Sequence, residues 1–186
     1  STFLQGNPTS MNAMDRVSNG DGNAWTLSMW VKPASSATGS QTLFNYGSGS
    51  AVNTGAITLY QSSNSLLLQY GTVSNKILIA ALSCLTVGSW NNVVVTFDGG
   101  TTGVASGSLS NYYSRFKIAV NGVNKTTNGS HQNYGYDGVL NGNDVSDNIF
   151  RIGRDNNVYN NYFDGVINQV AIWSSDESAN LSDIYN

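Results

Sequence analysis

Residues that could catalyse a reaction are scarce in this sequence. Cleavage of a glycosidic bond needs two carboxyl groups about 5–10 Å apart, yet the chain has one glutamate, Glu177, in a polar stretch near its C-terminus. No expected strand carries acids at positions i and i+2, the spacing that would place two on one face. The sequence therefore predicts a protein that is not an enzyme. The alternative is an acid pair assembled from separate loops, for instance among Asp137, Asp144, Asp147 and Asp155.

The other reactive side chains lack partners along the chain. His131 is the one histidine and lies in a Gly-rich stretch, so we expect a solvated loop residue and not a general base. Cys84 is the one cysteine, and its apolar surroundings at residues 77–85 predict a small buried hydrophobic residue. Zinc needs three or four His, Cys or acidic ligands, which one histidine and one cysteine do not supply.

Tyrosines occur beside amides and carboxylates in the segments that we expect to be loops. Sugar recognition uses aromatic rings against the apolar face of a pyranose, and amides or carboxylates for its hydroxyl groups. For any single tyrosine, packing at a strand edge with a wet hydroxyl group is the alternative. We therefore predict that ligand contacts come from these loop residues: Tyr112, Tyr113, Tyr134, Tyr136, Asp155, Asn157, Tyr159 and Tyr162.

The charge of the chain excludes some partners. Charged residues make up 10% of the sequence, the net charge is -3, and no run of Lys or Arg could follow a phosphate backbone. Nucleic acid and anionic membranes are therefore poor candidate partners. No apolar run approaches the roughly 20 residues that span a bilayer, so no membrane insertion is expected. The uncharged polar surface favours an extracellular, cell-surface or virion-surface location. With no initiator Met and no signal peptide, we expect a mature product or an excised domain.

Alternating apolar residues predict strands along most of the chain. Residues 25–32 alternate, with Trp25 and Met29 on the buried face and Ser28 and Trp30 on the other. Residues 91–97 and 163–173 are apolar on both faces, which is typical of central strands. In the second of these we expect one face to contain Ile167, Ala171 and Trp173, opposite Val166, Val170 and Ile172. Further strands are expected at residues 43–46, 56–60, 65–70, 77–81, 116–120 and 148–152.

Turn and helix signals complete the expected fold. Asn121-Gly122 is a strong hairpin dipeptide because both residues tolerate positive φ. Leu181, Ile184 and Tyr185 have helical spacing, so a short turn of helix is expected within residues 178–185, closing one end of the structure. Residues 101–114 and 131–147 are predicted to be long surface loops. Many short strands with one short helical turn predict a single all-β sandwich over residues 1–186.

Several motifs in a fixed order carry a resemblance. They are T-L-S-M-W-V-K-P at residues 26–33, W-N-N-V-V-V-T-F-D-G at 90–99, F-K-I-A-V-N-G at 116–122, F-R-I-G-R at 150–154 and F-D-G-V-I-N-Q-V-A-I-W at 163–173. Together they resemble the laminin-G-like domains of the concanavalin A-like lectin/glucanase superfamily. The resemblance implies an antiparallel jelly-roll β-sandwich. Gly153 and Gly165 in these motifs are expected to allow a close backbone approach or a bulge.

The resemblance also implies calcium as a ligand. Relatives often hold Ca²⁺ with Asp and Asn side chains and backbone carbonyls, and the ion takes six to eight oxygens. Asp98, Asp164 and Asn168 are the candidate metal ligands. The family often has Asp where this chain has Asn168, which weakens a site there, and turn capping is the alternative role for all three.

Two functions remain open from the sequence, besides the enzyme alternative. The first is a non-catalytic, lectin-like module that binds carbohydrate, with or without calcium. The second is a structural or adhesion domain of a larger assembly, such as a phage or virus appendage or a cell-surface protein. The partner would be a glycan or a protein surface, and the second function predicts an apolar patch or a homo-oligomer.

Overall fold

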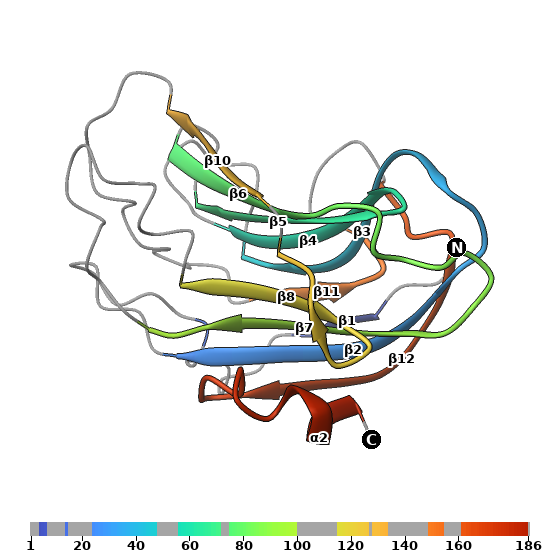
Figure 1. The fold of residues 1–186 in the computed structure, drawn as a ribbon. Helices are drawn as coiled ribbons and strands as arrows, with labels where there is room; N and C mark the ends of the chain where they lie inside the picture. Colours follow the sequence, from blue (N-terminus) through green and yellow to red (C-terminus); the bar gives the residue numbers. More distant parts are fainter. Residues whose placement is uncertain are drawn as a thin grey trace.

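The computed structural model describes residues 4–6, 14, 24–47, 56–71, 75–99, 115–126, 128–133, 149–154 and 161–185. Their strands form two antiparallel sheets that face each other across one core (Figure 1). One sheet has the order β1 (Leu4–Gly6), β11 (Phe150–Ile152), β3 (Ala37–Tyr46), β4 (Ala56–Ser63), β5 (Ser65–Gly71), β6 (Asn75–Ala81), β10 (Asn128–Asn133). The other has the order β12 (Gly165–Trp173), β2 (Trp25–Pro33), β7 (Asn91–Phe97), β8 (Phe116–Val120), β9 (Val123–Asn124).

Strand β2 shows how the sequence pattern produces the core. Its inward residues are almost fully buried, as the alternation predicted: Trp25, Leu27, Met29 and Val31. The Trp25 ring centroid lies 6.1 Å from that of Phe97 on β7 and 6.3 Å from that of Phe116 on β8. The Phe97 and Phe116 rings stack at 4.6 Å. This aromatic group joins the three middle strands of the five-stranded sheet.

The seven-stranded sheet supplies the opposite half of the core. On β4, β5 and β6 its buried inward residues are aliphatic: Ile57, Leu59, Leu66, Leu68 and Ile79. Cys84 packs half-buried against this core, and its thiol donates to the Ala81 carbonyl at 3.1 Å. Burial raises the pKa of this thiol. Cys84 therefore packs against the core as predicted, but it is half-buried and not fully buried.

Strand β7 is central, as predicted, and all seven of its residues are buried. Its partner Ala119 on β8 is also buried, although Ala119 and Val94 face away from the core. Residues 174–185 run below the five-stranded sheet and cover this outward face (Figure 1). Burial on both faces explains why the apolar alternation disappears in β7.

Strand β12 corrects two expectations. It is an edge strand and not a central one, because it pairs only with β2 in this sheet. The ladder also shifts between Asn168 and Ala171, where Gln169 adopts φ 49°. Three steps along β12 therefore match two along β2, which is a β-bulge. Ile167, Val170 and Ile172 pack against the core, and Trp173 faces outward, contrary to the grouping expected from strict alternation.

Two strands were not expected. β10 occupies residues 128–133, so the first part of the loop predicted at 131–147 is a strand paired with β6. β1 pairs with β11 at the opposite edge. The rest of that predicted loop up to residue 147, and the whole loop predicted at 101–114, lie outside the described residues.

Two predicted glycine positions have clear physical reasons. Asn121 and Gly122 have φ of 52° and 74°, the left-handed values that a two-residue hairpin of this type requires. A Cβ on Gly165 would lie 2.4 Å from the Lys32 carbonyl oxygen, so only glycine fits this approach of β12 to β2. The predicted hairpin and the predicted close approach are therefore both confirmed.

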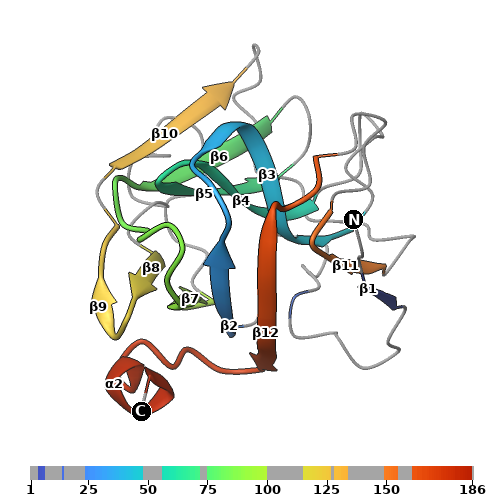
Figure 2. The same cartoon turned by 90° about the vertical axis from the view of Figure 1, so that its right-hand side faces the viewer.

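The short helical turn expected within residues 178–185 is confirmed as the C-terminal helix α2 (Leu181–Tyr185). It lies on the outer face of the five-stranded sheet and not across an end of the sandwich (Figures 1 and 2). In the described part of the chain, no helix is long and apolar enough to cross a membrane.

Candidate ligand-binding pocket

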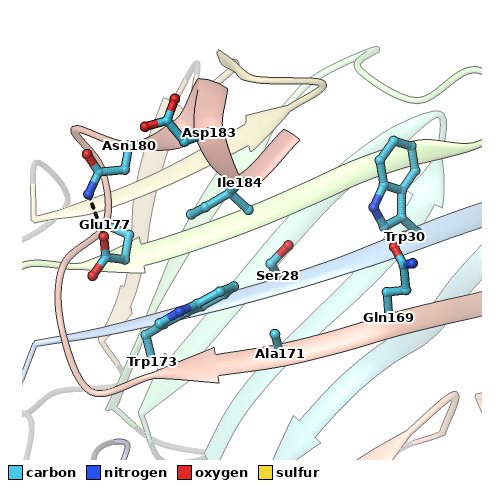
Figure 3. A pocket seen from close by; sticks show the side chains of 9 residues that line it. All are labelled: Ser28, Trp30, Gln169, Ala171, Trp173, Glu177, Asn180, Asp183 and Ile184. Carbon is cyan, nitrogen blue, oxygen red and sulfur yellow. Dashed lines mark hydrogen bonds between the residues drawn. The ribbon is translucent and has the colours of Figure 1, made fainter. Parts of the chain in front are cut away.

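A pocket opens on the outer face of the five-stranded sheet, between β12, β2 and the C-terminal segment (Figure 3). Its floor is a pair of small residues, Ser28 on β2 and Ala171 on β12, which are direct register partners. The indole of Trp30 lies two residues after Ser28 on β2, and the indole of Trp173 lies two residues after Ala171 on β12. Because the strands run antiparallel, the two tryptophans lie at opposite ends of the floor. Because the side chains of Ser28 and Ala171 are much smaller than the indoles on either side of them, the surface is hollowed between the two tryptophans.

The bulge in β12 determines which side chains reach this pocket. Ala171 and Trp173 face outward because the extra residue at Gln169–Val170 resets the alternation. The amide N–H of Gln169 donates to the Asn168 side-chain oxygen at 2.8 Å, which satisfies a backbone group that the bulge removes from the ladder. The Gln169 side chain lines the pocket near Trp30 (Figure 3).

The third wall is the segment 174–180, and one threonine fixes it to the sheet. The buried hydroxyl group of Thr26 donates to the Ser175 carbonyl at 2.8 Å and accepts from the Glu177 N–H at 2.9 Å. Both bonds join residues about 150 positions apart in the sequence. They place Glu177 beside Trp173 at one end of the pocket (Figure 3).

Glu177 is held as an oriented carboxylate. Ser175 donates its hydroxyl proton to one carboxylate oxygen at 2.5 Å, and the Asn180 side-chain amide donates to the other at 2.6 Å. These two hydrogen bonds, the one from Ser175 first, lower the pKa of Glu177 below its ordinary value. Each oxygen keeps one further acceptor position, so the group can receive hydrogen bonds from a ligand.

Helix α2 closes the remaining side of the pocket with Asp183 and Ile184. Tyr185 stacks on Trp30 with ring centroids 5.9 Å apart and an interplanar angle of 27°. The Tyr185 ring also packs over Gly122, where a Cβ would lie 3.5 Å from the Tyr185 Cβ. Trp30 is therefore held between the helix and the sheet, and α2 is fixed against the hairpin.

The resulting pocket has a volume of about 550 Å³ and is open to solvent. Its lining combines two indoles with two carboxylates and two amides, from Glu177, Asp183, Gln169 and Asn180. The half-buried Trp173 contributes its indole directly to the pocket lining. This arrangement can bind a molecule that has both an apolar face and hydrogen-bond donors.

A family model for the concanavalin A-like lectin/glucanases superfamily, of the laminin G type, matches residues 6–180 of the chain. The chain belongs to this laminin-G-like family. The resemblance inferred from the motifs is thereby confirmed, and so is the jelly-roll sandwich. No curated protein sequence matches the chain.

Solved structures with the same laminin-G-like sandwich are distant in sequence. The carbohydrate-binding module of a Ruminococcus gnavus sialidase, bound to α2,3-sialyllactose, aligns with a TM-score of 0.60 at 13% identity, covering 88% of this chain and 83% of that one. The binding domain of botulinum neurotoxin serotype G gives 0.63 at 11%, covering 98% and 40%. Domains LG4-5 of the mouse laminin α1 chain give 0.57 at 10%, covering 94% and 40%. These identities establish a common fold.

Most ligand residues predicted from the sequence lie outside the described residues: Tyr112, Tyr113, Tyr134, Tyr136, Asp155, Asn157 and Tyr159. The acids of the enzyme alternative, Asp137, Asp144 and Asp147, lie there too. Tyr162 is described, and its backbone forms an isolated bridge with Thr42 of β3, away from the pocket. The Arg154 guanidinium lies over the Tyr162 ring, 6.0 Å from its centroid, so one face of this ring is covered.

The three candidate metal ligands do not form one site. Asp98 follows the end of β7 that pairs with Trp25, and it forms an ion pair with Arg115 at 3.2 Å. Asp164 precedes the start of β12 at the other end of β2, and it accepts from the Ser35 hydroxyl group at 3.0 Å. The Asn168 oxygen accepts the bulge N–H. Within the described ranges, no group of three or more His, Cys, Asp or Glu residues could hold a metal ion.

Sequence reasoning missed the tryptophan pocket, although a signal for it is present. Two strands contain the same short pattern, a small residue followed two positions later by tryptophan: Ser28-Met29-Trp30 and Ala171-Ile172-Trp173. In an antiparallel pair this pattern places small residues opposite each other between two indoles. The bulge at Gln169 hides the signal, because strict alternation assigns Trp173 to the core face.

A second pocket of about 500 Å³ lies at the β12 edge, between the two sheets. Its lining is mainly apolar and includes core residues, with Phe44, Phe150 and Ile172 among them. No charged side chain lines it. Its polar lining is limited to Asn168 and Gln169, so the tryptophan pocket, with two carboxylates and two amides, is the better candidate site for a hydrophilic ligand.

Proposed function

We propose that this protein is a non-catalytic carbohydrate-binding module that holds a saccharide in the pocket between Trp30 and Trp173. The observation that carries the proposal is the outward indole of Trp173, which lines one pocket together with an oriented carboxylate and two amides. A pyranose ring offers an apolar face for the indole and hydroxyl protons for the surrounding oxygens. The pocket volume suits a ligand of one or two sugar units.

The charge state of Glu177 argues against a role as general acid in glycoside cleavage. A general acid in glycoside cleavage needs a raised pKa, so that it carries a proton at neutral pH. The pKa of Glu177 is lowered instead, because Ser175 and Asn180 donate to its carboxylate. In this pocket Glu177 therefore acts as a hydrogen-bond acceptor.

The family supports a binding role without fixing the ligand. One structural neighbour is a sialidase carbohydrate-binding module in complex with sialyllactose, and another is a neurotoxin binding domain. We place the protein outside the cell, as a secreted, cell-surface or virion component, in keeping with its weakly charged polar surface. Calcium binding stays a prediction from the resemblance, with no role assigned in this pocket.

Replacing Trp173 tests the proposed function. Binding would be measured with an array of neutral, cationic and anionic glycans, followed by calorimetry on the best ligand. Trp173→Ala should weaken this ligand about tenfold or more, because it removes the stacking surface. Trp90→Ala is the matched control, since Trp90 is 43% exposed and does not line the pocket. Failure of every glycan to bind, with the protein folded, would refute the proposal.

A domain of a larger assembly is the alternative function, and one observation favours it. Trp90 and Val166 are 43% and 53% exposed. Trp90 precedes Asn91, the register partner of Val31, and Val166 pairs with Lys32, so both lie at the same end of the five-stranded sheet. Light scattering at increasing concentration separates the two functions. A dimer that Trp90→Ser converts to monomer would favour the assembly role.

A further inference from the structure

The charged side chains that line the tryptophan pocket are both acidic. Glu177 and Asp183 line it, Asp176 lies one residue before Glu177, and none of the nine lining residues is basic. Two described lysines lie on this face of the sheet without lining the pocket: Lys32, two residues after Trp30 on β2, and Lys117, which donates to the Ser178 hydroxyl group at 3.0 Å. An anionic ligand would therefore meet two carboxylates with no neutralising partner among the lining residues.

The carboxylates are positioned to receive a cation. The two donors on Glu177 leave one acceptor position on each of its oxygens and hold the group ionised. The Trp173 indole stands beside this carboxylate (Figure 3). An aromatic face with an adjacent carboxylate is the combination that recognises an ammonium group, through cation–π attraction and a charge-assisted hydrogen bond.

We propose that the pocket selects saccharides with a free amino group, the hexosamine class, and rejects acidic glycans. This inference rests on the proposed carbohydrate-binding function and adds the charge of the ligand to it. The sugar ring stacks on Trp173 while its ammonium group donates to Glu177, with Asp183 adding negative potential at the rim. The preference is opposite to that expected for a sialic acid ligand, which carries a carboxylate.

Three saccharides with the same sugar chain but different charges test this selectivity. The probes are three β1,4-linked glucosamine tetrasaccharides with free amines, N-acetyl groups or N-sulfate groups, measured by calorimetry at about pH 6, where aliphatic amines are protonated. The free-amine probe should bind about 3- to 10-fold more tightly than the N-acetylated one, which is the effect of a solvent-exposed ion pair with a cation–π contact. The N-sulfated probe should bind most weakly.

Two charge-neutralising variants locate the effect. Glu177→Gln should weaken the free-amine probe more than the N-acetylated one, so that the preference for the free amine falls to about twofold or less. Asp164→Asn, which removes the same charge outside the pocket, should leave the preference unchanged. Equal binding of the free-amine and N-acetylated probes, or tighter binding of the sulfated one, would overturn the charge selectivity while the proposed function stands. A preference that survives Glu177→Gln would overturn the assignment to this carboxylate. No binding of any saccharide, including those of the array, would remove the proposed function itself.

Discussion

The carboxylate of Glu177 shows how one side chain acquires a defined role from its neighbours. Its low pKa comes from two hydrogen bonds, which outweigh the opposing effects of burial and of the neighbouring Asp176 charge. Its folded-state pKa lies below the ordinary value of 4.5 that applies to the unfolded chain. The resulting stabilisation is therefore present above that unfolded value and is lost as the pH falls through the folded-state pKa.

Removing the first of the two donors should raise the pKa. In Ser175→Ala, the pKa of Glu177 should move up toward 4.5, because the hydrogen bond from Ser175 is the larger cause of the shift. NMR titration of the Glu177 carboxyl carbon measures this directly. Ser182→Ala, which removes a donor from Asp183, serves as the control. An unchanged Glu177 titration in Ser175→Ala would contradict the proposed hydrogen bond.

Thr26 should matter more for stability than its position suggests. Thr26→Val keeps the side-chain volume but leaves the Ser175 carbonyl and the Glu177 N–H without their partner. We expect a loss of about 1–3 kcal/mol in the free energy of unfolding, measured with urea. Thr38→Val, at an exposed site on β3, should stay within about 0.5 kcal/mol of the wild-type chain. A value for Thr26→Val as small as the control would show that the C-terminal segment is anchored by other contacts.

At the level of elements, the β12 bulge determines the outward face of the site. A one-residue deletion in a strand normally turns every later side chain to the other face. In β12, removing Gln169 should instead restore a regular ladder, with Ala171 still opposite Ser28 and Val170 still inward. The deletion should therefore leave the fold largely intact, although it removes the Gln169 amide from the pocket.

Deleting Val170 is the matched test of this interpretation. The chain becomes equally short, but Gln169 then occupies the inward position against the core. Burying that amide should cost about 1–3 kcal/mol of stability relative to the Gln169 deletion, measured by chemical denaturation. If the two deletions were equally destabilising, β12 would not contain a removable extra residue at this position.

The strands of the core could be predicted from period-two alternation, and the exceptions have physical causes. β10 was not predicted because residues 128–133 contain no apolar side chain, and an edge strand can form from backbone pairing alone. The faces of β12 were wrong beyond Gln169 because a bulge centred on glutamine leaves no glycine as a marker. β7 was correctly placed in the centre because both of its faces are apolar.

The site was less predictable than the fold for a related reason. Tyrosines in loops resemble a sugar site by composition, yet the described pocket is built from strand tryptophans and the C-terminal segment. Its floor and its far wall, Ser28 and Glu177, are distant in the sequence, and they meet only because β12 pairs with β2. A single sequence shows residue types, whereas this pocket depends on register.

At the scale of the molecule, the candidate site lies on the outer face of the five-stranded sheet. The five-stranded sheet buries Val94 and Ala119 on its outer face under the C-terminal segment, and it carries the pocket beside that segment. The same sandwich recurs in proteins of 10–16% identity. The fold thus supplies a rigid platform, and the ligand depends on what the outer face presents.

The four tryptophan indoles offer the most direct measurement of the central claim. In a ¹⁵N-resolved NMR titration with a bound saccharide, the indole N–H signals of Trp30 and Trp173 should shift. Those of Trp25, which is buried in the core, and Trp90, which lies outside the pocket, should stay in place. Shifts at Trp90 alone, or saccharide binding with both pocket indoles unmoved, would contradict a site between β12, β2 and the C-terminal segment.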